Sequence, residues 1–282
     1  MSARRTASCA ASLAPHVTDA SRRACLTRPL YQLLLHARSP RLGFSYTAPS
    51  AARTAAIEII PIVDRGLGNS SYLVDLEDGQ GLVVDPARDP APYLELAEAR
   101  GLRLRWAAET HLHADFVSGG RELGAEGAQL LAPARSELAF DHRGVGDGEQ
   151  LDLGGLTLGV MTTPGHTPEH VAYLLSDGDQ PLALFSGGTL MAGGVARTDL
   201  VSPELTEQLA RDAYASIHQK LLTLPDELAV FPTHGAGSFC SVAPTGERTT
   251  TIGRERTTNP HLQADNVDEF VRSVLGGLED RL

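Results

Sequence analysis

The sequence predicts an α+β protein in which a set of strands followed by helices occurs twice. Three observations support this prediction. Short runs of β-branched and aliphatic residues, broken by Gly- and Asp-rich turns, fill residues 57–85. The same pattern returns within residues 150–186. After each of these regions comes a segment whose apolar residues recur on one helical face.

In the first half, apolar runs predict strands at 57–63, 72–76, 81–85 and 102–109. Before the last of these, residues 90–100 place Tyr93 and Ala97 on one face. Gly101 follows, at the position where a helix commonly ends in a left-handed residue. We therefore expect a helix over 90–100, and a second, shorter helix–strand step over 119–132.

In the second half, strands are predicted at 150–163, 171–176, 182–186 and 228–231. Ser202, Pro203 and Glu204 form a typical helix start, with a cap, a proline at the first position and an acid near the positive end of the dipole. Apolar residues then recur every four positions as far as Leu221. A closing amphipathic helix is expected over 267–278.

The composition is that of an ordinary globular domain, and its charge argues against two classes of partner. The 282 residues are 42% hydrophobic and 21% charged, with a formal net charge of −11 at pH 7. Nucleic acids and anionic membranes are therefore unexpected partners. No apolar run reaches the roughly 18 residues of a membrane span. Three cysteines without paired spacing (Cys9, Cys25 and Cys240) favour a reducing compartment over disulfides.

Residues 1–56 differ in composition from the rest. They contain eight arginines and a single acid, Asp19, and lack helical or strand periodicity. Three interpretations stay open: a disordered tail or misassigned start, a mitochondrial type of targeting peptide, or an export signal. We therefore expect an extension over 1–56 and one domain over 57–282. The expected location is cytoplasmic, or the mitochondrial matrix if the extension is a transit peptide.

The residues that suggest chemistry follow the C-terminal ends of three predicted strands. His111, His113 and Asp115 lie at alternate positions where the 102–109 strand opens into a loop. Two imidazoles and a carboxylate at this spacing can reach one ion, and they suit Zn, Fe or Mn. The alternative is a polar surface loop whose histidines are incidental.

Two further histidines follow later strands in the same way. His166 stands in Thr-Pro-Gly-His-Thr, where the Pro-Gly turn directs the ring away from the strand. His234 follows the apolar 228–231 run in Pro-Thr-His-Gly. Each alone is also explained by a solvated turn. Together, because loops at one edge can converge, they predict a metal centre built from His111, His113, Asp115, His166 and His234.

These motifs resemble those of the metallo-β-lactamase superfamily. The resemblance rests on Thr-His-x-His-x-Asp, Thr-Pro-Gly-His-Thr, Phe-Ser-Gly and Pro-Thr-His, which start at Thr110, Thr163, Phe185 and Pro232. Three stretches, at 109–119, 196–200 and 251–260, are similar to the persulfide dioxygenase branch. The resemblance spans residue 57 to the C-terminus. It implies a four-layer αβ/βα sandwich (the metallo-β-lactamase fold) that binds one Fe(II) or Zn(II) ion.

The sequence departs from the family pattern at two positions. Where the superfamily motif ends in Asp-His, this chain has Phe116, which removes a ligand of a second metal ion and disfavours a dinuclear hydrolytic site. Iron-binding members use two histidines and a carboxylate that follows Ser/Thr-Gly. Here Gly188 stands at that position and cannot coordinate. If Gly188 faces the ion, the substitution Gly188→Asp should raise the affinity for iron.

Three ligand arrangements therefore remain open. Asp115 supplies the missing carboxylate, or His111, His113 and His166 hold the ion as in a catalytic zinc site, or metal binding is weak or lost. In a zinc hydrolase Asp115 would also be the catalytic group, as the base that orients a water molecule.

Four more residues are candidates for contact with the substrate. Cys240 would accept or carry sulfane sulfur, unless it is an inert buried cysteine. Arg197 either lines the cleft or forms a structural ion pair with Asp199. Arg254 and Arg256 would hold the carboxylates of glutathione, unless they lie on a solvated helix face.

The leading hypothesis is a mononuclear metal enzyme of sulfur metabolism. Like persulfide dioxygenases, it would oxidise the persulfide of glutathione or a related thiol to sulfite. The alternatives are a thioester hydrolase of the glyoxalase II type, and a non-catalytic sulfur-binding or regulatory protein that has lost metal ligands. The expected partner is a small thiol persulfide or thioester. Many members of this branch carry a rhodanese domain that this chain lacks, so a separate rhodanese is a candidate partner, and a homodimer is a candidate assembly.

Overall fold

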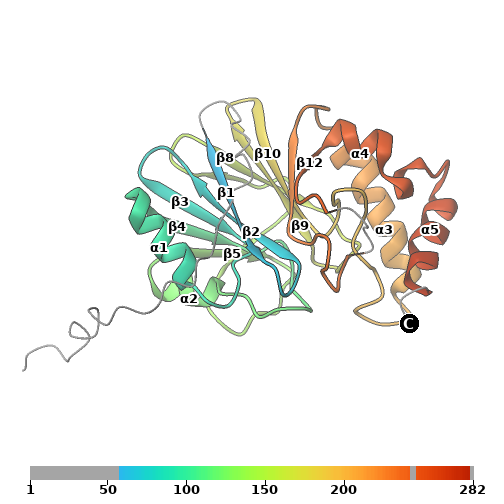
Figure 1. The fold of residues 1–282 in the computed structure, drawn as a ribbon, viewed down its shortest axis with the longest axis horizontal. Helices are drawn as coiled ribbons and strands as arrows, with labels where there is room; N and C mark the ends of the chain where they lie inside the picture. Colours follow the sequence, from blue (N-terminus) through green and yellow to red (C-terminus); the bar gives the residue numbers. More distant parts are fainter. Residues whose placement is uncertain (1–56, 242–245, 280–282) are drawn as a thin grey trace, which may run out of the picture. The chain divides into compact units, whose positions relative to one another are not determined.

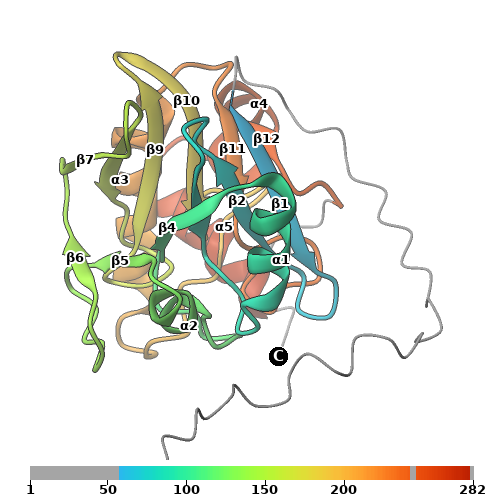
Figure 2. The same ribbon diagram turned by 90° about the vertical axis from the view of Figure 1, so that its left-hand side faces the viewer.

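Two mixed sheets form the centre of the computed structural model, which describes residues 57–241 and 246–279 (Figures 1 and 2). The strand order is β1-β2-β3-β4-β5-β6 in the first sheet and β12-β11-β10-β9-β8-β7 in the second. The extension predicted over 1–56 lies outside the described residues.

The first sheet contains β1 (Glu58–Asp64), β2 (Asn69–Asp75), β3 (Gln80–Val84), β4 (Arg103–Ala108), β5 (Gln129–Pro133) and β6 (Arg143–Val145). β1 to β3 form the expected antiparallel start. β3 to β6 run parallel, with α1 (Ala91–Arg100) between β3 and β4 and α2 (Gly120–Ala125) between β4 and β5. Gly101 ends α1 in the left-handed conformation, with φ 68°, as predicted.

The second sheet contains β7 (Gln150–Asp152), β8 (Thr157–Thr162), β9 (Val171–Asp177), β10 (Gln180–Gly187), β11 (Ala229–Pro232) and β12 (Thr250–Thr251). Only β10 and β11 pair in parallel among these strands, because α3 (Thr206–Gln219) crosses between them. The remaining elements are η1 (Leu221–Thr223), α4 (Ile252–Thr258), η2 (Pro260–Gln263) and α5 (Val267–Glu279). In the described residues no helix combines the length and the apolar character needed to span a membrane.

Alternation along the central strands divides the core into three layers of side chains. In β2, Tyr72 packs between the two sheets, whereas Leu73 packs with Tyr93 of α1. In β10, Phe185 packs between the sheets, whereas Leu184 packs against the helices on the far side. α1 and α2 thus cover the first sheet, and α3 and α5 cover the second (Figure 1). The predicted four-layer αβ/βα sandwich is confirmed.

One predicted strand is divided in two. Residues 150–163 form β7 and β8, an antiparallel pair joined by Gly154 and Gly155, with φ 93° and 118°. The Asp152 carboxylate accepts both glycine N–H groups, at 2.8 and 3.2 Å. Apolar residues continue on both sides of this turn, so the pattern predicted one strand. Only the two glycines and the hydrogen bonds to Asp152 distinguish the turn from the strands.

The predicted helix start at Ser202 is wrong. α3 begins at Thr206, after Leu205, and no side chain caps it. The Ser202 carbonyl instead accepts the N–H of Leu205 at 3.2 Å and the hydroxyl of Thr206 at 3.0 Å. Ser202 and Pro203 therefore form a separate turn before the helix, although their residue types are those of a cap and a first helical position.

Candidate metal centre

The predicted metal-binding histidines meet at one edge of the sandwich, beyond the C-terminal ends of strands from both sheets. His111 and His113 follow β4, His166 follows β8 and His234 follows β11. The ring centroid of His111 lies 4.1 Å from that of His113, 4.7 Å from that of His166 and 5.2 Å from that of His234. Each sheet supplies two of the four rings, so the centre exists only where the sheets are packed together.

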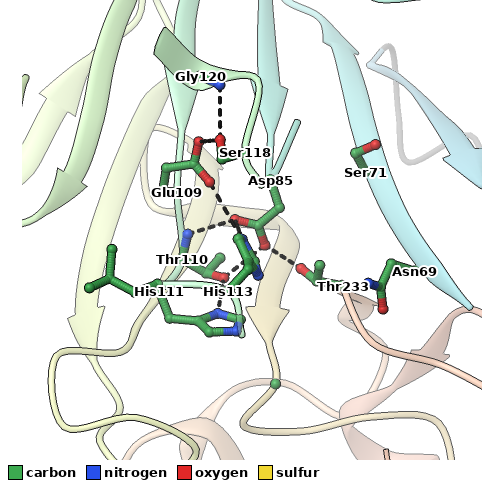
Figure 3. A network of polar contacts seen from close by, with 12 residues as sticks. Asn69, Ser71, Asp85, Glu109, Thr110, His111, His113, Ser118, Gly120 and Thr233 are labelled. Carbon is green, nitrogen blue, oxygen red and sulfur yellow. Dashed lines mark hydrogen bonds and ion pairs between the residues drawn. The ribbon is translucent and has the colours of Figure 1, made fainter. Parts of the chain in front are cut away.

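Asp85, directly after β3, connects the loops that hold these histidines (Figure 3). It is buried, and its φ of 48° lies in the left-handed region. One carboxylate oxygen accepts the backbone N–H of Thr110 at 2.7 Å. The other accepts the hydroxyl of Thr110 at 2.7 Å and that of Thr233, next to His234. A single carboxylate thereby fixes the ends of β4 and β11.

His113 points its Nε2 at two buried carboxylates, 3.3 Å from Asp85 Oδ1 and 3.4 Å from Glu109 Oε2. Burial opposes protonation of His113, but the two carboxylates outweigh it and raise the pKa of His113 to about 10. Burial alone would raise the pKa of Asp85, yet the charge of His113 and the hydrogen bonds hold it below its ordinary value. Nδ1 of His113 is buried and has no hydrogen-bond partner among the described residues, so it would bind an ion once it has released its proton.

His111 and His234 bring their Nε2 atoms to 3.1 Å from each other. The Thr110 hydroxyl gives its proton to Asp85, so it accepts the Nδ1–H of His111, at 2.8 Å. The amide oxygen of Asn69 accepts the Nδ1–H of His234 at 3.0 Å. Both Nε2 atoms therefore carry lone pairs, which repel unless a cation lies between them. Two nitrogens on one tetrahedral ion, each about 2.0–2.1 Å from the metal, would be about 3.3 Å apart.

His166 completes the cluster in the same protonation state. The backbone carbonyl of Arg197 accepts its Nδ1–H at 2.7 Å, and its buried Nε2 has no hydrogen-bond partner in the described residues. Burial lowers the pKa of His166 to about 4 and that of His234 to about 3. Both imidazoles are thus neutral at pH 7 and suited to bind a metal, and the donor set as a whole fits a metal ion.

Asp115, predicted as a ligand and as the catalytic group, lies beside His234. Its Oδ2 accepts the amide N–H of Asn69 at 2.8 Å and the hydroxyl of Ser238 at 3.2 Å, and it is 3.6 Å from His234 Nδ1. Oδ1 is buried and has no hydrogen-bond partner among the described residues. The structure does not place Asp115 in any group whose donor atoms all lie within 4.8 Å of one another.

Cys240, the candidate substrate contact six residues after His234, lies in the cluster. Its sulfur and donor atoms of His166 and His234 lie within 4.8 Å of one another. Burial and the nearby Asp115 carboxylate raise the pKa of the Cys240 thiol well above its usual range. The centre therefore contains a protonated thiol next to neutral imidazoles.

Gly188 faces His166. A Cβ added at Gly188 would be 2.7 Å from His166 Cδ2 and 3.0 Å from the Cβ of Ala196. The backbone N–H of Gly188 donates to Nε2 of His170 at 3.0 Å, and the ring of His170 stacks on His111 with centroids 4.8 Å apart. His170 therefore supports the cluster from behind, with its accepting nitrogen already occupied.

The candidate arginines are paired with acids. Arg197 binds Asp199 in a bidentate pair, at 2.7 Å for each contact, and lies over the ring of Phe239. On α4, Arg254 pairs with Glu247 at 2.5 Å and Arg256 with Asp226 at 2.8 Å; all four side chains are more than 40% exposed. The structure brings Arg197 to His166 through its backbone carbonyl, but it links neither Arg254 nor Arg256 to the histidines.

Several contributing residues are not apparent from the sequence. The side chains that contact the histidines or the backbone beside them are those of Asp85, Asn69, Glu109 and Ser238, and Thr233 acts through Asp85. Asp85 and Thr233 do follow strands, as the metal motifs do, and this was the one signal available. The Asn69 contact depends on β2 beginning three residues before the predicted start at Tyr72.

The fold and the metal centre define a class of protein. Residues 64–234 match the model of the metallo-β-lactamase superfamily, and the chain belongs to that superfamily.

Within the superfamily, the chain is similar to two kinds of enzyme. It is 32% identical over 212 residues to human mitochondrial persulfide dioxygenase ETHE1, covering 74% of this chain and 76% of the relative. It is 41% identical over 181 residues to a hydroxyacylglutathione hydrolase of Methylobacillus flagellatus, covering 63% and 66%. The crystal structure of ETHE1 from Myxococcus xanthus superposes with a TM-score of 0.66 at 27% identity, over 77% of this chain and 89% of that one.

Proposed function

We propose that this chain is a mononuclear metal-dependent enzyme that oxidises the persulfide of a small thiol. The observation that carries the proposal is a cluster of four imidazoles, in which the rings of His113, His166 and His234 lie 4.1–5.2 Å from that of His111, in a site where Phe116 replaces a further ligand. One persulfide, one O₂ and one water would give the parent thiol, sulfite and two protons.

A single ion is favoured by the surroundings of His113. The Phe116 ring stacks on the His113 ring with centroids 4.1 Å apart and planes 24° apart. An apolar ring thus covers the flank where the superfamily motif would offer a histidine to a second ion. Gly188 lacks the carboxylate that iron-binding members place after Ser/Thr-Gly, so imidazoles would have to hold the ion. Phe116 therefore supports a one-metal chemistry over a dinuclear one.

We propose Fe(II) as the ion for this reaction, with Zn(II) as the alternative. Nε2 of His111, His166 and His234 would hold it, with Nδ1 of His113 as a fourth donor. Bound iron would supply redox capacity toward O₂, whereas zinc would supply Lewis acidity.

The side chains around the ion have separable roles in this proposal. Asn69 and the Arg197 carbonyl fix the tautomers of His234 and His166. Burial would raise the pKa of Asp115, but interactions that include the hydrogen bond from Asn69 outweigh it and lower that pKa, so the carboxylate is ionised. Its free Oδ1 would accept the persulfide proton. The sulfur of Cys240 and donor atoms of His166 and His234 lie within 4.8 Å of one another. Once its thiol has lost its proton, Cys240 would take the outer sulfur of the persulfide and release the parent thiol.

The direct test is oxygen uptake with glutathione persulfide by iron-loaded protein. We expect uptake above the metal-free control, about one iron per chain, and loss of both in His166→Ala. His218→Ala is a matched control, because His218 also has an unpartnered Nε2 but stacks on Tyr214 of α3. No uptake with glutathione persulfide or with an alkyl persulfide, by protein shown to contain iron, would remove the proposal.

A second candidate function is thioester hydrolysis, which neutral imidazoles and a nearby carboxylate favour. The similarity to a hydroxyacylglutathione hydrolase supports it, and Phe116 and Gly188 count against it. Cleavage of a lactoylglutathione-type thioester by zinc-loaded protein, with no oxygen uptake by iron-loaded protein, would establish this reaction instead. A metal content below about 0.1 ion per chain after loading would favour a non-catalytic sulfur-binding role over both.

A further inference from the structure

A pocket of about 360 Å³ adjoins the histidine cluster on the side of α2. Its lining includes His111 and His113 of the cluster and Leu130 and Ala132 of β5. Its volume is at the lower end of the range for small-molecule sites, roughly 300–1,000 Å³. The pocket therefore has room for a small organic group whose reacting end is at the metal centre.

The walls of this pocket are largely apolar, and they continue to its mouth. Phe116, Leu138 and Phe140 line it beside the β5 residues. Leu112 and Val117 also line it, and both are large apolar residues exposed to solvent, at 45% and 63%. Exposed apolar side chains around a concave site are typical of a binding surface for an apolar partner or ligand.

An unsatisfied polar atom lies in the same pocket. Ser136 is only 7% exposed, and its hydroxyl has no hydrogen-bond partner in the described residues. The buried carboxylate of the lining, Glu109, already faces Nε2 of His113 through its Oε2, at 3.4 Å. Buried polar atoms are nearly always partnered in folded proteins. A ligand with an apolar body and one polar atom would supply the partner that the Ser136 hydroxyl lacks.

The charges nearby do not suit a carrier with several carboxylates, such as glutathione. Arg121 is the pocket's one arginine or lysine among the described residues, and Glu109 and Glu122 line the same space. Arg197 is already neutralised by Asp199, and both arginines considered for glutathione on α4 pair with acids. The carboxylates of such a carrier would lie near Glu109 and Glu122, which would repel them.

We propose that this pocket binds the organic group of the substrate and selects an apolar one, so that the preferred substrates are alkyl or aryl thiol derivatives rather than glutathione derivatives. The proposal deepens the function proposed above and rests on it for the position of the sulfur. The pocket itself can be tested without any reaction.

The experiment measures binding and turnover separately. Binding of 1-hexanol, which has no sulfur, is followed by calorimetry on zinc-loaded protein. Turnover is compared for ethyl to hexyl persulfides and glutathione persulfide on iron-loaded protein. We expect kcat/KM to rise about fourfold for each added methylene until the pocket is full. Glutathione persulfide should be the poorer substrate.

Leu138→Asp and Val117→Asp place a charge in the pocket, and Val201→Asp is the matched control at another exposed valine, 46% accessible. The exposed Val117 keeps the test valid if Leu138→Asp does not fold. Both pocket variants should weaken hexanol binding at least tenfold and flatten the dependence on chain length, and the control should change neither. Equal hexanol binding in all four proteins, or an active enzyme that prefers glutathione persulfide, would overturn the proposal. Inactivity toward every persulfide and thioester would remove the proposed function, and the hexanol measurement would still decide the pocket.

Discussion

Replacing Asp85 by asparagine should have the largest effect on stability of any single conservative change at the metal centre. The carboxylate accepts three hydrogen bonds from Thr110 and Thr233 and faces the His113 ring. The asparagine amide has only one oxygen that accepts hydrogen bonds. Its NH₂ group would therefore face buried groups of Thr110 or Thr233 that donate to Asp85 in the wild type. Removing one partner of a buried pair costs about 3–5 kcal/mol. For a domain of this size, that loss corresponds to a decrease in Tm of roughly 6–20 °C.

The assay is chemical denaturation of metal-free protein, followed by circular dichroism. Asp152→Asn is the control, because Asp152 also accepts two backbone N–H groups but is exposed, and its change should be within experimental error. Zinc affinity of Asp85→Asn should fall about 10- to 100-fold, since the positions of His111 and His113 depend on this carboxylate. A destabilisation of Asp85→Asn below about 1 kcal/mol would refute the role assigned to Asp85.

Three further outcomes are expected. Gly188→Asp and Gly188→Ala should both lose about 1–3 kcal/mol of stability, because the new Cβ displaces His166; iron affinity should be higher for Asp than for Ala, and equal affinities would show that a carboxylate there does not reach the ion. Because the raised pKa of His113 keeps it protonated at pH 7.5, zinc binding should release about one proton per chain. Calorimetry in buffers of different ionisation enthalpy measures this number. The Cys240→Ser variant should release the same number, whereas one proton fewer would identify the thiol as a ligand. Gly101→Ala should lower the free energy of unfolding by about 1 kcal/mol, because the left-handed C-cap of α1 disfavours a side chain; thermal denaturation that shows no loss would contradict this.

The layers of the fold were predictable because the strands have clear apolar patterns and each half also contains helices with apolar residues on one face. Tyr72, Leu73 and their neighbours alternate between two cores, as a strand covered on both faces requires. Boundaries were less predictable. Ser202 has the residue type of a helix cap but begins a separate turn, and the β7–β8 turn is concealed by apolar residues on both sides.

For the metal centre, the sequence identified the residues that could bind an ion but not those that orient them. His111, His113, His166 and His234 were found because imidazoles after strand ends are uncommon and share a recognisable setting. Asp85 and Asn69 form hydrogen bonds with residues far away in the sequence, and no local pattern indicates such contacts. The approach of Cys240 to His166 likewise depends on the path of a loop.

The division of the ligands between the two sheets has a consequence for folding. His111 and His113 belong to one half of the chain, His166 and His234 to the other, and the Asp85–Thr233 hydrogen bond joins the halves. Neither half alone would hold the full set of imidazoles. Binding and packing are thermodynamically linked. An ion bound by all four histidines would increase the affinity of the two halves for each other, and the packing of the halves would increase the affinity for the ion by the same factor. Metal binding would therefore stabilise the packing of the two sheets against each other. Loss of the metal would weaken this packing before either sheet unfolds.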